Sequence, residues 1–155
     1  MKRVSLLFIC ILFPLLVGSI SGYFTIDGVK DWYVTLNKPS FTPPNWLFGP
    51  VWTCLYLLMG IAFYRALQKS TEENKRSIIG IFALQLFFNF WWSILFFHFH
   101  TISAALVDIL ILWICILLMI IRFRKSDVFA GYSQIPYLLW VSFASALTLS
   151  IWWLN

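Results

Sequence analysis

Residues 32–60 read WYVTLNKPSFTPPNWLFGPVWTCLYLLMG, and this stretch decides how the rest of the chain is interpreted. It holds three of the nine Trp and four of the six Pro, and it runs directly into an apolar helical pattern. On a water-soluble domain, so much exposed aromatic surface would promote aggregation. At the mouth of a membrane bundle, the prolines instead stiffen the backbone and remove N–H donors that would need partners. The stretch therefore predicts an aromatic lid over a pocket at membrane depth.

The composition of the whole chain points to the same environment. Hydrophobic residues make up 61% of the 155 residues and charged residues 11%, whereas soluble domains carry about 25% charged residues. The net charge of +5 comes from Lys and Arg in short connections between apolar runs, which is a topology signal and not a nucleic-acid-binding surface. We expect one domain over residues 1–155, embedded in a lipid bilayer and without a nucleic-acid partner.

Five apolar runs are long enough to cross a bilayer, which needs about 20 residues per helix. The chain is therefore predicted to be an all-α integral membrane bundle, with residues 25–45 as the lid. The first run could instead be a signal peptide, because it has a basic start and small residues near its end; its GxxxG pair, Gly18 and Gly22, favours a retained helix. The predicted transmembrane helices are Val4–Phe24, Trp46–Leu67, Ile78–His98, Ile102–Ile121 and Gln134–Leu154.

Lys and Arg are distributed unevenly between the two sides that these helices create. Only Lys30 and Lys38 fall on the side of the lid. Basic residues favour the cytoplasmic side, so we expect the N-terminus inside and the lid and C-terminus outside. The other basic residues are Lys2, Arg3, Arg65, Lys69, Lys75, Arg76, Arg122, Arg124 and Lys125.

Aromatic and amide side chains recur at helical spacing on one face of three of the runs. Polar groups at membrane depth are costly, so each needs a reason. Their mixture suits a flat, mainly apolar ligand with one or two acceptors, although the same stripes could serve helix packing and interhelical hydrogen bonds. They are Trp52 and Tyr56 in the second run, Gln85, Asn89 and Trp92 in the third, and Trp140, Phe143 and Ala144 in the fifth.

Three other polar residues have simpler interpretations. Asp108 is the only acid well inside a run, and it lacks a second buried acid or an Arg, which favours a protonated or hydrogen-bonded structural carboxyl over a proton relay. His98 and His100 flank the shortest connection and could ligate haem iron or a metal; without Cys or carboxylate companions, we expect them to face solvent, and we predict no metal site. No hydrolytic or phosphate-binding motif is present, so conventional catalysis is not expected.

Four blocks of sequence resemble the translocator protein family, also called tryptophan-rich sensory proteins or peripheral-type benzodiazepine receptors. They occur in family order and span most of the chain. They are WY-x-x-L-x-KPSF-x-PP-x-W-x-x-GPVW-x-x-LY-x-x-MG (Trp32–Gly60), QL-x-x-N-x-x-W (Gln85–Trp92), ALVD (Ala105–Asp108) and PYL-x-W-x-x-FA-x-x-L (Pro136–Leu147).

The resemblance implies five helices around a ligand cavity, usually in a homodimer, and binding of porphyrins such as protoporphyrin IX or of isoquinoline carboxamides. By motif match, Trp52 and Asn89 would contact a ligand carbonyl, and Trp140 would join Trp52 as the indoles nearest a photo-excited porphyrin. The other cavity residues would be Tyr33, Pro43, Pro44, Tyr56, Gln85, Trp92, Phe143 and Ala144.

The chain departs from animal members at its C-terminus. Their sterol-associated Tyr and Arg are replaced here by Leu149 and Trp153, which disfavours cholesterol as the native ligand. The sequence also leaves the dimer surface open. We expect a porphyrin-binding receptor of a bacterial plasma membrane with no obligatory cofactor. A tetrapyrrole transporter and a light-dependent porphyrin-degrading protein that uses Trp residues remain alternatives, as does an outer mitochondrial location.

Overall fold

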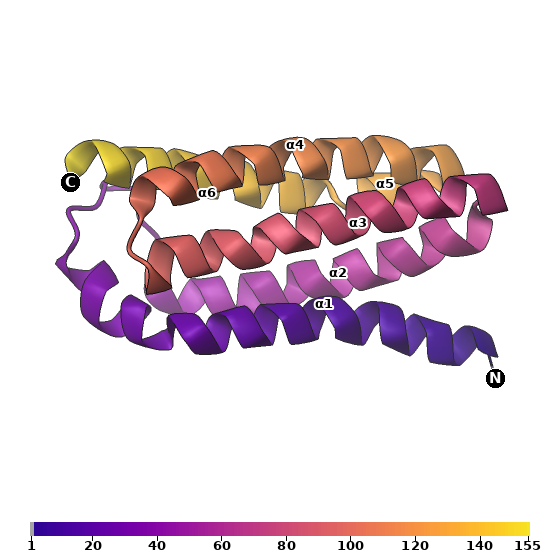
Figure 1. Cartoon of the computed structure of the whole chain (residues 1–155), viewed down its shortest axis with the longest axis horizontal. Helices are drawn as coiled ribbons and strands as arrows, with labels where there is room; N and C mark the ends of the chain where they lie inside the picture. Colours follow the sequence, from indigo (N-terminus) through magenta and orange to yellow (C-terminus); the bar gives the residue numbers. More distant parts are fainter. Residues whose placement is uncertain (1) are drawn as a thin grey trace.

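The computed structural model describes residues 2–155, which form an elongated bundle of helices without strands (Figure 1). Five helices are long and apolar enough to cross a membrane, which confirms the predicted all-α fold with five spans. The two termini lie at opposite ends of the bundle. The five long helices are α1 (Lys2–Asp27), α2 (Phe48–Lys69), α3 (Glu72–Ser93), α4 (Ile102–Ser126) and α6 (Ile135–Leu154), and the short α5 (Val128–Tyr132) precedes α6.

The segment expected as a loop, residues 25–45, is helical over its first part. After α1 the chain forms a π-helical turn, η1 (Gly28–Trp32), and a 3-10 turn, η2 (Tyr33–Thr35). A second π-helical turn, η4 (Ile94–His98), extends α3. The two π turns pack together because Gly28 has no side chain: a Cβ there would lie 1.7 Å from the carbonyl oxygen of Phe97. Only residues 36–44 are then irregular, before the 3-10 turn η3 (Asn45–Leu47).

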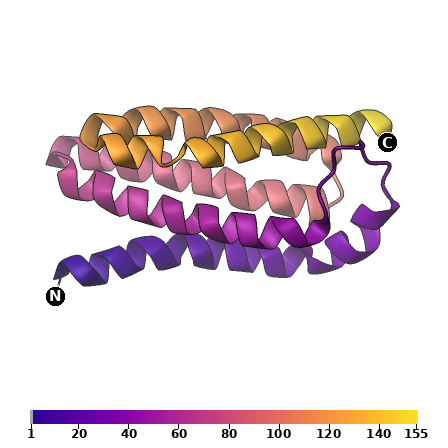
Figure 2. The same ribbon diagram turned by 180° about the vertical axis from the view of Figure 1, so that it is seen from behind.

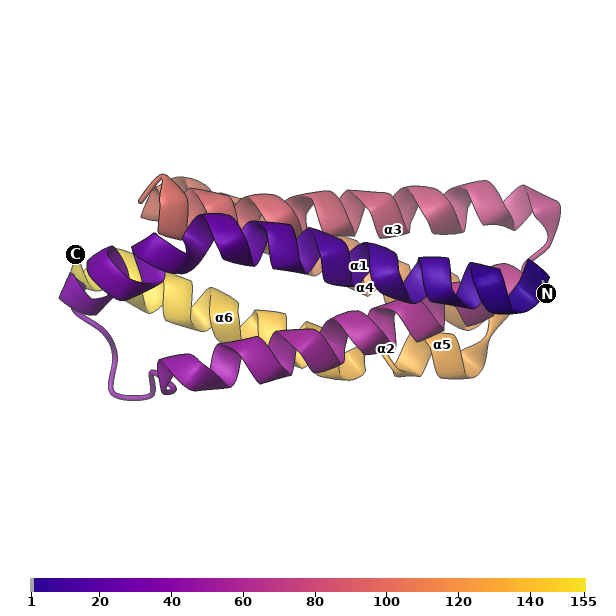
Figure 3. The same cartoon turned by 90° about the horizontal axis from the view of Figure 1, so that it is seen from below.

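Helix α1 lies on one side of the bundle, against α2 and α3 (Figure 3). Its backbone approaches α2 closely at Gly60, where a Cβ would lie 2.5 Å from the Cα of Ile11. Helix α4 packs between α3 and α6, and side chains such as Leu112, Ile116 and Phe123 are completely buried there. The core is therefore centred on α4, and α1 completes the bundle from outside.

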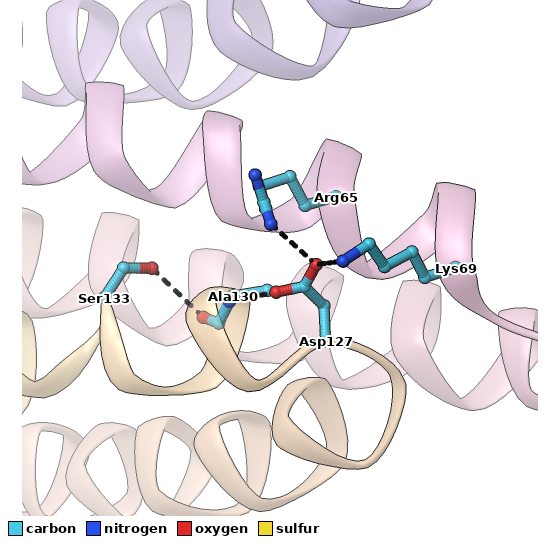
Figure 4. A network of polar contacts seen from close by, with 5 residues as sticks. All are labelled: Arg65, Lys69, Asp127, Ala130 and Ser133. Atoms are coloured by element: carbon cyan, nitrogen blue, oxygen red, sulfur yellow. Dashed lines mark hydrogen bonds and ion pairs between the residues drawn. The ribbon is translucent and has the colours of Figure 1, made fainter.

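The end of the bundle near the N-terminus, called here the basic end, is joined by an ion-pair network (Figure 4). The side chain of Asp127 is 1% exposed, and its carboxylate accepts hydrogen bonds from Arg65 at 3.0 Å and from Lys69 at 2.6 Å. Its other oxygen accepts from the backbone N–H of Ala130 at 2.9 Å, which caps α5. The network links the end of α2 to the start of α5 and thereby fixes where the last span begins.

The opposite end, called here the loop end, holds residues 28–47, 94–101 and the C-terminus. There the irregular loop runs past the end of α6 (Figure 2). Asn37 donates its backbone N–H to Oδ1 of Asn155 at 3.0 Å, and Nδ2 of Asn155 donates to the carbonyl oxygen of Asn37 at 3.0 Å. The same Nδ2 donates to the carbonyl oxygen of Ile151 at 2.8 Å. The middle of the loop is thus attached to the last turn of α6.

Candidate functional site: an aromatic cavity between α1, α2 and α3

A cavity of about 290 Å³ lies between α1, α2 and the end of α3. Four of the residues predicted from the sequence line it: Tyr33, Trp52, Tyr56 and Trp92. This volume is at the small end of the range of about 300–1,000 Å³ that is typical of ligand pockets. Trp52 and Tyr56 of α2 and Trp92 of α3 therefore face this cavity, whereas the other two residues predicted on α3 do not line it.

The aromatic side chains form one continuous wall of this cavity. The rings of Trp52 and Tyr56 are stacked, with centroids 5.6 Å apart, and Trp92 lies 6.3 Å from Trp52. Phe97 continues the wall, 6.1 Å from Trp92 and 5.5 Å from Tyr33. Such a wall offers both flat apolar contact and aromatic faces to a planar ligand.

The facing wall comes from α1 and was not predicted as part of the site. Besides Leu15 and Ser19, it presents small residues at a spacing of three to four: Gly18, Ser21, Gly22 and Thr25. The hydroxyls of Ser21 and Thr25 donate to the carbonyl oxygens of Gly18 and Gly22, at 3.1 and 3.0 Å. Because these hydroxyls donate back to their own helix, the wall presents a smooth, mostly apolar surface. The GxxxG signal was visible in the sequence, but it was interpreted only as helix contact.

Asn89 and Gln85 lie below the cavity, in a buried network, and are not among its lining residues. The hydroxyl of Tyr56 donates to Oδ1 of Asn89 at 2.6 Å, and Nδ2 of Asn89 donates to the hydroxyl of Tyr137 at 3.0 Å. Tyr137 in turn donates to Oε1 of Gln85 at 3.0 Å, and Nε2 of Gln85 reaches the sulfur of Met59 at 3.5 Å. Asn89 is 1% exposed and Gln85 is 0% exposed, so their present role is to join α2, α3 and α6.

The remaining predicted residues surround the loop and do not line the cavity. Trp140 packs its ring 5.9 Å from Phe48, and Phe143 lies 6.2 Å from Phe41 of the loop. Ala144 is 3% exposed on the same helix, and Pro43 and Pro44 are half-buried and exposed, respectively, in the loop. Of the predicted residues, the cavity therefore includes Tyr33, Trp52, Tyr56 and Trp92, and it does not include the predicted residues of α6 or the two prolines of the loop.

Several buried polar atoms have no hydrogen-bond partner among residues 2–155. Two of them, the hydroxyl of Tyr33 and Nε1 of Trp92, belong to residues that line the cavity, and a third is Nε1 of Trp140. Trp52 is half-buried, and its indole N–H is not among these buried atoms. Buried donors without partners are rare in proteins and call for an explanation. A ligand acceptor would supply one.

Two further predictions concern polar residues outside the cavity. Asp108 is 7% exposed, and its Oδ2 has no hydrogen-bond partner among the described residues. That oxygen therefore makes no bond to a neighbouring helix, and the expectation of a protonated structural carboxyl stays a prediction. His98 and His100 are both exposed, as expected. No group of three or more His, Cys, Asp or Glu within residues 2–155 is arranged to hold a metal ion.

The fold and this cavity define a multi-pass helical membrane protein with an aromatic pocket among its helices. Residues 10–154 match the TspO/MBR family, and the chain belongs to that family. It is 41% identical to the tryptophan-rich protein TspO of Chlorobaculum tepidum over 99% of this chain and 98% of the relative. It is 44% identical to the protein of the same name from Archaeoglobus fulgidus, over 94% of each chain. It is 31% identical to the translocator protein of Bos taurus, over 91% and 85%.

Proposed function

We propose that the chain is a membrane receptor for a porphyrin or a related flat, mainly apolar ligand. The observation that carries this proposal is the cavity lined by Trp52, Tyr56 and Trp92, with the smooth small-residue wall of α1 opposite. Apolar contact at about 25 cal/mol per Å² of buried surface would supply most of the affinity. The N–H of Trp52 would orient a ligand acceptor, and family membership supports the same ligand class.

The size of the cavity implies that a tetrapyrrole binds with some widening. Helix α1 is the element best able to move, because most of its apolar side chains face away from the rest of the chain and it contacts mainly α2 and α3. Widening would also give a ligand access to the donors of Tyr33 and Trp92. Asn89 would contact a ligand carbonyl only after releasing Tyr56 or Tyr137, so we assign the first polar contact to Trp52.

Titration of the purified protein with protoporphyrin IX in darkness tests the proposal. We expect saturable quenching of tryptophan fluorescence by the wild type, and Trp52→Ala should raise Kd about tenfold, which corresponds to about 1.4 kcal/mol. Trp153→Ala is the matched control, because Trp153 is 81% exposed at the end of α6. Absence of saturable quenching would contradict the receptor role, and unchanged affinity in Trp52→Ala would place the ligand elsewhere.

We also propose a second ligand class, an assembly state and an orientation for the chain. Isoquinoline carboxamides would compete for the cavity, and the protein would work as a homodimer in the cell membrane with the basic end facing the cytoplasm. The alternative of light-dependent porphyrin degradation draws support from the adjacency of Trp52 and Trp92, whose ring centroids are 6.3 Å apart. Net movement of porphyrin into proteoliposomes would favour transport instead.

A further inference from the structure

A second hollow, of about 460 Å³, opens at the loop end between the end of α1 with η1 and the end of η4 with the connection to α4. We call it the rim hollow. Phe97 lines both the rim hollow and the aromatic cavity, so the two spaces are neighbours. Apart from Phe97, the proposed porphyrin site shares no lining residue with the rim hollow. Its volume falls within the range of about 300–1,000 Å³ that ligand pockets occupy.

Aromatic rings supply much of the lining of the rim hollow. Tyr23, Phe24 and Trp32 come from α1 and η1, and Phe97 comes from η4. The imidazole of His100 stacks on Trp32 with centroids 4.3 Å apart and an angle of 20° between the rings. His98 stands edge-on to Phe24, at 6.4 Å. The faces of such rings carry negative electrostatic potential and attract cations.

Two carboxylates complete the lining. Asp27 and Asp31 are four residues apart in the chain, both line the rim hollow, and both are exposed. Within the described residues neither carboxylate takes part in an ion pair or a hydrogen bond. Lys30, on the same turn, forms no ion pair either. The lining of the rim hollow therefore holds two acidic side chains that no Lys or Arg of the described residues pairs with directly.

The backbone around the rim hollow is built in an unusual way. Each of its walls includes a π-helical turn, η1 on one side and η4 on the other. Such turns are rare in proteins, and many of those known lie at functional sites. His100 has a φ of 57°, in the left-handed region that non-glycine residues seldom adopt. The stacking on Trp32 and the hydrogen bond from Thr101 N–H to the Leu95 carbonyl oxygen, at 2.9 Å, hold this connection in place.

We propose that the rim hollow is a second binding site, for a quaternary ammonium cation. Such a cation has no N–H groups to satisfy and a diffuse charge, so ring faces with nearby carboxylates recognise it well. A metal ion would need convergent ligands, and the described residues contain no suitable group of three. The cation could be the choline headgroup of a lipid or a soluble quaternary ammonium compound, because both present the same chemistry at the membrane surface.

The chain offers a selective probe of this site. It contains only two His, and both line the rim hollow. Protein labelled with ¹⁵N-histidine, with no affinity tag containing His, would be titrated in maltoside micelles with tetramethylammonium chloride. NaCl would keep the ionic strength constant, and the pH would be fixed. We expect the signals of His98 and His100 to shift together and to saturate.

Variants that remove charge distinguish specific binding of the cation in the rim hollow from general electrostatic attraction to the protein. The double variant Asp27→Asn/Asp31→Asn should raise the half-saturating concentration at least fivefold, and Tyr23→Leu should also raise it. The control Glu72→Gln/Glu73→Gln removes two charges at the basic end and should titrate as the wild type does. Shifts that never saturate, shifts that NaCl reproduces, or wild-type titration of the Asp27→Asn/Asp31→Asn variant would each overturn the proposal.

A comparison of two bilayers identifies the source of the cation. In nanodiscs of phosphatidylcholine, a site that takes lipid headgroups would show His signals already at their bound positions, and tetramethylammonium would move them no further. A site for soluble cations would show free positions in both phosphatidylcholine and phosphatidylglycerol nanodiscs, and would respond to the probe in both. The measurement is independent of porphyrin binding, so either proposal can fail alone.

Discussion

The hydroxyl of Tyr56 donates a 2.6 Å hydrogen bond to Oδ1 of Asn89. This bond joins a ring that lines the cavity and a buried amide of the next helix into one unit. Tyr137 extends this unit to α6. The shape of the aromatic wall therefore depends on polar contacts beneath it. A ligand that displaced Tyr56 would also disturb the packing of three helices.

Tyr137→Phe should destabilise the protein while keeping its shape. The change leaves Nδ2 of Asn89 and Oε1 of Gln85 without their partner, and both side chains are almost completely buried. The expected cost is about 1–3 kcal/mol, since buried polar groups lose their hydrogen bonds. Thermal unfolding in detergent would measure it, with Tyr23→Phe as a control because Tyr23 is 74% exposed. Equal midpoints for the two variants would contradict a structural role for the network.

Gly60→Ala should loosen the contact between α1 and α2. The added Cβ would meet backbone atoms, 2.5 Å from the Cα of Ile11 and 2.6 Å from the carbonyl oxygen of Cys10, and backbone cannot yield as a flexible side chain can. We expect a loss of about 1–3 kcal/mol from overpacking. Gly80→Ala is the matched control: nothing lies within 4 Å of its Cβ, so it should gain about 0.5–1 kcal/mol from helix propensity. The same denaturation assay on both variants checks the sign of each effect.

Asp127 should make stability depend on pH at the acidic extreme. It lies between the last two spans, outside the membrane-crossing segments. Burial by itself would raise the pKa of this carboxyl, but hydrogen bonds from Lys69, the Ala130 N–H and Arg65 outweigh it and lower the pKa to about 2. Because an unfolded Asp has a pKa of about 3.9, the contribution is complete above about pH 4 and is lost as the pH falls through about 2.

Asp127→Asn tests this assignment. Because Arg65 and Lys69 are partly exposed and screened by solvent, we expect a loss of about 1 kcal/mol at pH 7. The difference from wild type should shrink towards pH 2, where the wild-type carboxyl is itself protonated. Glu73→Gln, on an exposed residue near the same end, should change stability by less than about 0.5 kcal/mol. A difference that persists unchanged at pH 2 would mean that Asp127 acts through shape and not charge.

If porphyrin is degraded in light, Trp52 and not Trp140 should control the rate. Trp52 lines the cavity, whereas Trp140 packs against Phe48 outside its lining. We expect Trp52→Phe to slow the light-dependent loss of the porphyrin Soret band severalfold, and Trp140→Phe to leave the rate near that of wild type. Absorbance recorded under constant illumination distinguishes them. A larger effect of Trp140→Phe would show that the porphyrin lies closer to α6 than the cavity does.

The helices and one wall of the cavity could be predicted because both depend on local spacing. The apolar runs gave five spans, and i,i+4 spacing placed Trp52 with Tyr56. Whether a buried amide is available to a ligand or already hydrogen-bonded depends instead on residues far away in the sequence. Asn89 donates to the hydroxyl of Tyr137, which is 48 positions away. Sequence spacing could mark the polar face of α3 but not what covers it.

The positions of α6 and α1 residues relative to the cavity were harder to predict for a similar reason. Phe143 packs on Phe41 because the irregular loop runs back over α6, and the path of a loop is not encoded in helical periodicity. The small residues of α1 were visible in the sequence as a GxxxG motif, but such a motif can serve either a close helix contact or the wall of a cavity. At Gly18, a Cβ would lie 2.1 Å from the Tyr56 ring, so the same residue serves helix packing and cavity wall.

The reciprocal amide contacts between Asn37 and Asn155 tie the middle of the loop to the tip of the last helix. Both side chains are exposed, so water competes for each contact, and each one contributes about 1 kcal/mol or less. The loop is therefore held to the end of α6 by weak polar contacts and by the ring contact between Phe41 and Phe143. When the contacts with Asn37 break, Nδ2 of Asn155 can keep its bond to the carbonyl oxygen of Ile151 within the last turn of α6. A spectroscopic label on the final turn of α6 would sense each excursion of the loop without touching the aromatic cavity.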